Sequence, residues 1–322
     1  MSDPVAEPPA LPQISPSSPV LLTGATGFIG RRIQRALLQA GMAVRIVIRP
    51  GSLHRQHADQ RCELIECSLD DSEGLAGAVS GTRAVVYCAG SVRGRVLADF
   101  LPANVGGVKS ILQAMTCHAQ GTPFLLISSL AASRPGISHY ALSKHLGEQA
   151  VHAHAPSSWT ILRPPAVYGP GDTEIAPLLK WARRGLAIRT GPEDQRVSLL
   201  FADDLALAVV AWLNAWEHCT GMTCAIDDGH RGGYDWPAIV HAAGSSRYRA
   251  VRVPFALLAA VAWFNLAISR LAGYQPMLSP GKARELTQAD WLCDNTAFAR
   301  ATGWQPQTGL PSGIRLSLEQ PN

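Results

Sequence analysis

Short hydrophobic runs alternate with helical patterns through the first half of the chain. The runs predict strands over 19–22, 44–48, 64–65, 84–88 and 124–127, and the main helical stretches between them cover 31–39, 71–79 and 104–118. A strand that is covered by helices on both sides of a sheet has a continuous apolar run, as these strands do. The chain is therefore predicted to be an α/β protein with a doubly wound parallel sheet.

Three regions of the chain differ in pattern. Residues 1–18 are rich in proline and serine, which indicates a disordered leader. Residues 19–175 hold the regular alternation and are predicted to form one domain. Beyond 175 the pattern loosens, so 176–322 are predicted to form a smaller C-terminal substrate lobe that is partly interleaved with the first domain.

A glycine-rich turn follows the first predicted strand. Gly24, Gly27 and Gly30 have G-x-x-G-x-x-G spacing and open the first helix. Glycine lets the backbone turn tightly and approach a phosphate, and a helix N-terminus supplies partial positive charge to it. Between a first strand and a first helix, this pattern predicts a Rossmann-type domain that binds NAD or NADP.

A serine, a tyrosine and a lysine follow the fifth predicted strand. Ser129 ends the strand, with Ser128 as the alternative serine, and Tyr140 and Lys144 stand four residues apart in a Tyr-x-x-x-Lys pair. At that spacing on a helix the two side chains share a face. A nearby ammonium favours the phenolate and would lower the tyrosine pKa, which suits proton transfer at neutral pH. We therefore predict that Ser129, Tyr140 and Lys144 are catalytic.

The order of glycine loop, serine, tyrosine and lysine resembles the short-chain dehydrogenase/reductase superfamily, and Phe28-Ile29-Gly30 resembles its extended branch. Segments 162–171, 200–205 and 301–306 also resemble that branch. The resemblance implies that Asn104 supports the site and relays protons. It further implies cofactor contacts at Thr23, Gly24, Thr26, Gly27, Phe28, Ile29, Gly30, Ser68, Leu69, Ala89, Gly90, Lys144, Pro165 and Val167.

The residues at the end of the second predicted strand indicate whether NAD or NADP is bound. An NAD-binding chain usually places Asp or Glu near its end, to bind the ribose 2′-hydroxyl. This chain has Arg49 there, and Arg31 follows the glycines. Guanidinium groups suit a 2′-phosphate, so NADP is predicted, with NAD as the alternative. In the family an Asp after the third strand commonly holds adenine, whereas this chain has Ser68 at that position.

Several functions are compatible with this site. We favour hydride transfer between nicotinamide and a hydroxyl or keto group of a bulky, apolar small molecule, because the segment from Arg196 to Asp204 resembles the 3β-hydroxysteroid dehydrogenase and dihydroflavonol reductase group. A nucleoside-diphosphate-sugar epimerase is the first alternative, with arginines 189, 196, 247, 249 and 252 for the diphosphate. A non-catalytic NADP-binding sensor or assembly subunit is the second. A sugar-nucleotide 4,6-dehydratase is disfavoured, because Leu130 and Ala131 cannot transfer protons.

Composition restricts the partners. The net charge of +4, without a long basic block, argues against nucleic acid. The seven cysteines have no CxxC spacing, so we expect no metal site and reduced thiols in a cytoplasmic protein. The apolar segment 254–271 is predicted to be a buried or surface-associating helix, with peripheral membrane contact as the alternative. A homodimer is expected by analogy with the family.

Overall fold

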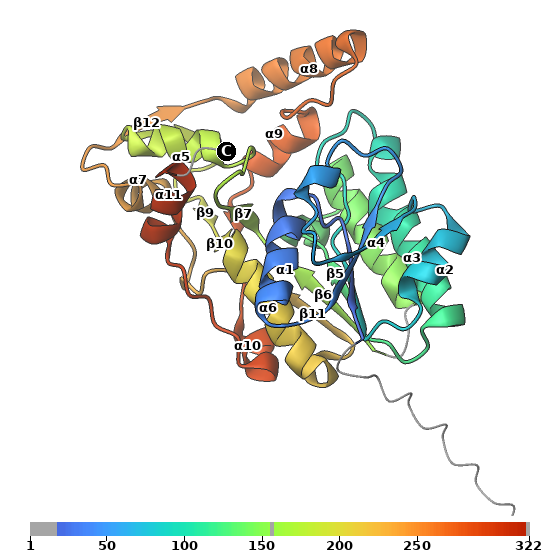
Figure 1. Ribbon diagram of the computed structural model, residues 1–322. Helices are drawn as coiled ribbons and strands as arrows, with labels where there is room; N and C mark the ends of the chain where they lie inside the picture. Colours follow the sequence, from blue (N-terminus) through green and yellow to red (C-terminus); the bar gives the residue numbers. More distant parts are fainter. Residues whose placement is uncertain (1–17, 155–157, 320–322) are drawn as a thin grey trace, which may run out of the picture.

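A single parallel sheet organises the protein. The computed structural model describes residues 18–154 and 158–319, so nearly all of the predicted leader lies outside the described residues. Seven strands lie in the order β11-β6-β5-β4-β1-β2-β3, and every pair is parallel (Figure 1). The strands are β1 (Val20–Thr23), β2 (Val44–Ile48), β3 (Glu63–Glu66), β4 (Ala84–Tyr87), β5 (Phe124–Ile127), β6 (Trp159–Arg163) and β11 (Met222–Ala225). The predicted Rossmann-type fold is confirmed.

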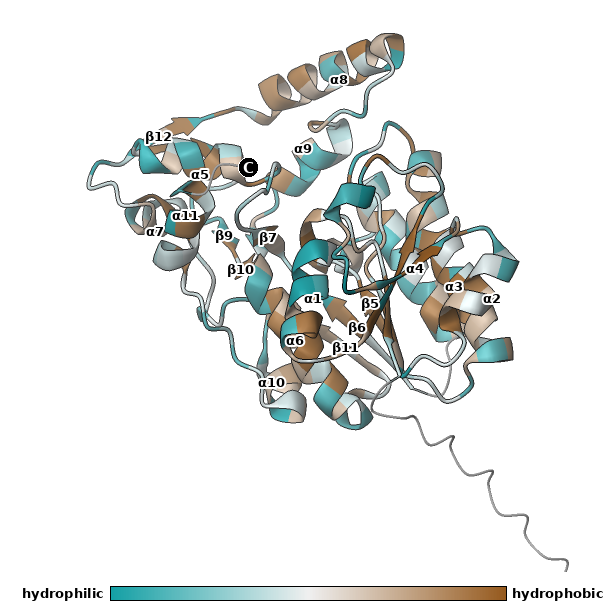
Figure 2. Cartoon of the chain, viewed as in Figure 1, coloured by the Kyte–Doolittle hydropathy of each residue, from teal (hydrophilic) through white to brown (hydrophobic). Residues whose placement is uncertain are grey.

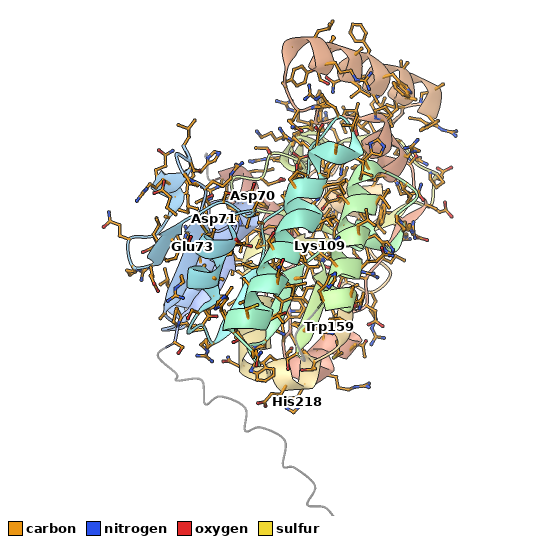
Figure 3. The ribbon with its side chains drawn as sticks, turned by 90° about the vertical axis from the view of Figure 1, so that its right-hand side faces the viewer. Asp70, Asp71, Glu73, Lys109, Trp159 and His218 are labelled. Carbon is orange, nitrogen blue, oxygen red and sulfur yellow. The ribbon has the colours of Figure 1, made fainter. Side chains whose placement is uncertain are left out.

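Helices cover both faces of this sheet. One face is covered by α2 (Ser72–Val79), α3 (Gly107–His118) and α4 (His139–His154), and Figure 3 views it from outside, with Lys109 of α3 on the exposed surface. The other face packs against α1 (Phe28–Gln39) and α6 (Ala202–Ala215). Trp212 of α6 is fully buried in that second layer. The unbroken apolar strands are explained by these two cores.

The chain beyond residue 175 builds a second group of elements and also returns to the sheet, because β11 pairs with β6. Three small parallel pairs join β7 (Ala166–Tyr168) to β10 (Leu199–Phe201), β8 (Leu186–Arg189) to β12 (Arg249–Arg252), and β9 (Arg196–Val197) to β13 (Asp290–Trp291). The helices are α5 (Ala176–Arg183), α7 (Trp236–Ala242), α8 (Phe255–Ala272), α9 (Pro280–Leu286), α10 (Thr296–Thr302) and α11 (Leu310–Glu319). A separate core lies between β7, β10, α5, α7 and α11.

Two expectations about helices need correction. The stretch predicted as one helix over 104–118 begins with a π-helical turn, Pro102–Gly106, and the α-helix starts only at Gly107. The apolar segment 254–271 forms α8, but most of its side chains are exposed, so its interpretation as a buried helix is wrong. Figure 2 shows hydrophobic colour along α8 as well as in the central strands.

A buried carboxylate fixes α4 to the sheet. Glu148 accepts a hydrogen bond from the Ser128 hydroxyl at 2.5 Å and two from the Arg163 guanidinium, at 2.9 and 2.5 Å. A charge taken out of water needs such partners, because removing one leaves the other uncompensated. This cluster therefore holds three segments together, namely the end of β5, α4 and the end of β6.

Replacing Glu148 by glutamine should destabilise the fold. Glu148→Gln leaves the Arg163 guanidinium without its counter-charge, so the free energy of unfolding should fall by about 3 kcal/mol. Urea denaturation measures it. The control is Glu63→Gln, because Glu63 pairs with Arg45 at 2.8 Å but is half exposed, and such pairs contribute less than about 1 kcal/mol. Equal losses of unfolding free energy in the two variants would show that the buried cluster stabilises the fold no more than the exposed ion pair does.

Candidate active site

The loop after β1 lies directly against the loop after β4. Gly24 has a φ of +68°, and a Cβ on it would stand 2.7 Å from backbone atoms of Ala89. A Cβ on Gly30 would collide with the carbonyl oxygen of Gly24. Helix α1 begins at Phe28 with no side-chain cap and no acidic residue in its first turn. The free N–H groups and the bare glycine backbone therefore fit the phosphates of a dinucleotide.

Thr23 supports this loop from behind. Its side chain is fully buried, and its hydroxyl oxygen accepts hydrogen bonds from the N–H groups of Cys88 and Ala89, both at 3.2 Å. The hydroxyl thus ties the end of β1 to the end of β4. Gly90 follows in the same loop, where a Cβ would come within 2.9 Å of the Asn104 amide oxygen.

The predicted 2′-phosphate and adenine contacts lie at the ends of β2 and β3. Arg49 is exposed immediately after β2, and the Nε atom of Arg31 is buried without a hydrogen-bond partner among the described residues. Ser68 donates its hydroxyl hydrogen to the Asp70 carboxylate, and Leu69 lies against Gly107 of α3. Two guanidinium groups with unused donors suit an additional phosphate.

Three residues of α4, spaced four apart, contact the end of β5 and the two serines after it. Tyr140 lies close enough to Ser129 for that side chain to act on its phenol, Lys144 donates from Nζ to the Ile127 carbonyl oxygen at 2.8 Å, and Glu148 accepts from Ser128. The spacing predicted for Tyr140 and Lys144 therefore extends by one further turn. Because Ser128 is bound to Glu148, the structure brings Ser129 and not Ser128 to Tyr140.

The environment of Tyr140 differs from the expectation. Burial raises the pKa of the Tyr140 phenol, and the neighbouring Ser129 side chain opposes that rise. The charges of Glu285 and Lys282, both from α9, act on the same phenol with opposite signs. We predicted that Lys144 lowers the Tyr140 pKa. The structure shows the opposite direction, because the loss of solvent around the phenol is the largest effect and raises its pKa.

Lys144 is a buried ammonium group. Burial lowers the pKa of Lys144 to about 8, and the nearby Cys88 and Glu148 oppose that shift. Among the hydrogen bonds of the described residues its one partner is the Ile127 carbonyl, although an ammonium has three donors. The remaining donors suit the ribose hydroxyls of a bound cofactor.

Asn104 lies in the π-helical turn before α3 and is buried. Its amide nitrogen donates to the Ser91 carbonyl at 3.0 Å and to the Ser143 hydroxyl at 2.8 Å, and its amide oxygen accepts from the Ser91 N–H at 2.9 Å. It therefore links the loop after β4 to α4 between Tyr140 and Lys144. This is the supporting position that the resemblance implied, and its part in proton relay stays a prediction.

The other predicted contacts lie along the same side of the molecule. Thr26, Phe28 and Ile29 are partly exposed in the loop and the first turn of α1. Pro165 and Val167 are partly buried beside and in β7, where Val167 pairs in register with Leu200. Their contacts with nicotinamide stay predictions.

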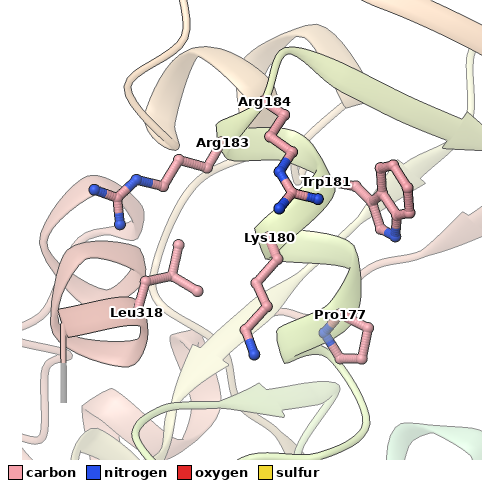
Figure 4. Close-up of a pocket in the computed structure, with 6 residues that line it drawn as sticks. All are labelled: Pro177, Lys180, Trp181, Arg183, Arg184 and Leu318. Atoms are coloured by element: carbon pink, nitrogen blue, oxygen red, sulfur yellow. The ribbon is translucent and has the colours of Figure 1, made fainter. Parts of the chain in front are cut away.

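A surface hollow of about 600 Å³ lies between α5 and α11, as Figure 4 shows. Its lining residues are Pro177, Lys180, Trp181, Arg183, Arg184 and Leu318. None of them belongs to the predicted catalytic or cofactor set. The predicted catalytic residues at the end of β5 therefore lie outside this hollow.

Comparison with known proteins agrees with this geometry. The family model described as "NAD dependent epimerase/dehydratase family" matches residues 20–220. The chain belongs to this family. The predicted resemblance to the extended short-chain dehydrogenase/reductase branch is thereby confirmed.

Two curated relatives of the chain are reductases. A ceramide reductase of Caulobacter vibrioides is 33% identical over 303 residues, which cover 93% of each chain. A 2-alkyl-3-oxoalkanoate reductase of Stenotrophomonas maltophilia is 25% identical over 92% of this chain and 97% of its own. Together with the family match, they support the prediction that this protein is an NAD(P)-dependent oxidoreductase.

A solved structure shows the same fold. The UDP-glucuronic acid 4-epimerase of Bacillus cereus, in complex with NAD, has a TM-score of 0.68 and 18% identity, and the match covers 93% of this chain and 97% of the epimerase. At that identity the likeness concerns the architecture alone.

Two further residues near this family's site were missed by the sequence prediction. Arg32 stacks over the Phe28 ring at 4.4 Å, donates to the Pro170 carbonyl and pairs with Asp203 at 3.1 Å, so it joins α1 to the segments after β7 and β10. Glu148 was also missed, although its spacing of four residues from Lys144 could have revealed it. No sequence pattern links Arg32 to its distant partners.

The pH dependence of turnover should follow Lys144. Its pKa is lowered to about 8, so the ammonium loses its proton as the pH rises through 8. The raised pKa of Tyr140 keeps the phenol protonated over the same range. We expect kcat/KM for the reduced cofactor, which reports the free enzyme, to be level near neutral pH and to fall as the pH passes about 8. A level profile far above that pH, with circular dichroism unchanged, would contradict this role.

Proposed function

We propose that the protein is an NADPH-dependent reductase that acts on a ketone in a ceramide-type lipid. The observation that carries the proposal is the 33% identity to a ceramide reductase over 93% of both chains. The second relative is named for a 3-oxo acid with an alkyl branch, which is also a ketone on a hydrocarbon chain. The common chemistry is reduction of a carbonyl group in a long-chain molecule.

The site contains the groups that this reduction needs. When bound, the reduced nicotinamide supplies a hydride to the carbonyl carbon. We expect Ser129 to hold the carbonyl oxygen and Tyr140 to donate its phenolic proton to that oxygen, so that C=O becomes CH–OH. The resulting phenolate regains its proton from solvent, and we expect a bound cofactor to be held by the Lys144 ammonium one turn further along α4.

Two observations support NADPH as the cofactor. Arg49 is exposed at the end of β2, where an NAD-binding chain usually has a carboxylate, and the buried Nε of Arg31 has no hydrogen-bond partner within residues 18–154 and 158–319. Glu66 is the nearby acidic group at the end of β3, but it already accepts hydrogen bonds from Arg55 at 2.8 Å and from the Gly51 N–H at 3.2 Å. With Glu66 occupied, the exposed Arg49 favours a cofactor that carries a 2′-phosphate.

The epimerase alternative has weaker support. Of the arginines considered for a sugar-nucleotide diphosphate, Arg189 pairs with Glu193 at 3.3 Å and Arg196 pairs with Asp235 at 3.5 Å. The epimerase structure shares only the architecture at 18% identity.

Reduction of a ketoceramide should depend on Tyr140. Tyr140→Phe removes the proton donor and should lower kcat by roughly a hundredfold to ten-thousandfold, while NADPH binding stays unchanged. Oxidation of NADPH with a ketoceramide in detergent micelles measures turnover. Tyr248→Phe, which alters an exposed phenol outside the site, is the matched control. Full turnover in Tyr140→Phe would remove the catalytic assignment, and turnover of UDP-sugars but not of ketoceramide would favour the epimerase.

Removal of Arg49 should affect one cofactor only. Arg49→Ala should raise KM for NADPH by roughly tenfold, because it removes a charged hydrogen bond to phosphate, and should leave KM for NADH nearly unchanged. Arg35→Ala removes an equally exposed charge from α1 and serves as the control. If the unmodified enzyme prefers NADH, the choice of NADPH is wrong.

A further inference from the structure

Helix α8 presents a continuous apolar stripe to solvent. Leu257, Val261, Phe264, Ile268 and Leu271 are exposed and follow one another at spacings of four and three residues. Side chains at that spacing lie on one face of a helix. We call these five residues the outward stripe. Phe264 is 69% exposed and Leu271 is 90% exposed, which is unusual for large apolar side chains in a row.

The opposite face of α8 attaches it lengthwise to the protein. Its buried residues are Leu258, Ala262, Leu266 and Ser269, and the first two form a small core with Ala283 of α9. In addition, Asn265 donates to the Leu278 carbonyl at 2.9 Å. With 18 residues, α8 is about 27 Å long and apolar enough to cross a membrane. It follows β12 and precedes α9 in the chain, and it packs on α9 at the outer edge of the molecule (Figure 1), an arrangement that suits a helix lying on a surface.

The segment of the chain that carries α8 has only basic charged residues. Between Asp235 and Glu285 the chain has no Asp or Glu. The same segment has six basic residues, namely Arg247, Arg249, Arg252, Arg270, Lys282 and Arg284. Three of these arginines precede the helix, Arg270 lies in its last turn, and all four are exposed. An apolar helix face bracketed by exposed arginines is the pattern that suits the surface of an anionic bilayer.

We propose that α8 docks the protein on an anionic phospholipid bilayer, with the outward stripe among the acyl chains and the arginines at the headgroups. Trp263, 60% exposed beside the stripe, suits the boundary between the two layers. A second copy of the chain is a poorer occupant of the same face. A symmetric pair would bring the arginines of both copies together, with no acidic residue in the segment to neutralise them.

The docking helix is connected directly to the catalytic region. Helix α9, which follows α8, places Gly281 against Ser138, and Glu285 accepts a hydrogen bond from the Ser138 hydroxyl. Arg284 donates to the Ile137 carbonyl at 2.7 Å. These contacts lie two and three residues before Tyr140. Docking through α8 thus brings α9 and the nearby Tyr140 region to the bilayer. This last step rests on the proposed lipid substrate.

Vesicle sedimentation tests the docking without any substrate. The full-length protein should sediment with vesicles of phosphatidylcholine and phosphatidylglycerol, and less with phosphatidylcholine alone, and salt should weaken the binding. Leu271→Glu and Phe264→Glu should each reduce binding to the mixed vesicles at least tenfold. Leu53→Glu is the matched control, because Leu53 is 88% exposed and the change in charge is identical. It should bind like the unmodified protein.

Three results would overturn the proposal. These are no sedimentation with the mixed vesicles, equal binding by Leu271→Glu and the unmodified protein, and light scattering that shows an α8-dependent dimer without vesicle binding. The last result would assign the outward stripe to a second copy. The expected scattering result is that the oligomeric state does not change in Leu271→Glu.

Activity separates this inference from the proposed function. With a short-chain, water-soluble ketone, Leu271→Glu should turn over like the unmodified enzyme, and with a ketoceramide in mixed vesicles it should be at least tenfold slower. Vesicle binding without any ketone reduction would leave the docking inference intact and overturn the proposed function. Reduction of micellar ketoceramide without vesicle binding would leave the proposed function intact and overturn the docking inference.

Discussion

The structure depends on the burial of Lys144 and Glu148, two charged side chains of α4, at the end of β5. Successive turns of α4 place Tyr140, Lys144 and Glu148 against Ser129, the Ile127 carbonyl and Ser128. A buried ammonium and a buried carboxylate are costly unless each finds a partner, and these partners exist only in one register of the helix against the sheet. The register that satisfies the charges is therefore also the one that brings Tyr140 to Ser129.

The same constraint explains the small residues around α4. The Asn104 carbonyl would collide with a Cβ at Gly147, and the Asn104 amide oxygen would be crowded by a Cβ at Gly90. The π-helical turn at Pro102–Gly106 offsets Asn104 from the regular helix that follows, and such turns are frequent at functional sites. Asn104 can thus reach the loop after β4 and Ser143 of α4 together. The cofactor side and the proton-transfer side of the site share this one residue as support.

Much of the fold and of the candidate site could be predicted, because it depends on residues that are close together in the sequence. The apolar runs identified the five strands from β1 to β5, and four-residue spacing identified the shared face of Tyr140 and Lys144. What could not be predicted depends on distant partners. Arg32 joins Pro170 and Asp203, far away in sequence, and the pKa of Tyr140 rises through burial that no spacing reveals. The sequence favoured Ser129 over Ser128, but the contact that occupies Ser128, its hydrogen bond to Glu148, could not be predicted.

Helix α9 is attached to the residues before Tyr140 by polar contacts. This explains why so much apolar surface of the neighbouring helix α8 stays uncovered. Glu285 and Arg284 of α9 are bound to Ser138 and the Ile137 carbonyl, and Arg134 is paired with Asp290. Hydrogen bonds fix direction while covering little area, so α9 is held beside Tyr140 without a large core of its own. Helix α8 packs only on this small unit, and most of its apolar side chains have nothing to cover them within the described part of the chain. An apolar helix exposed in this way lowers solubility unless another apolar phase covers it, and α9 is the element that connects α8 to the residues just before Tyr140.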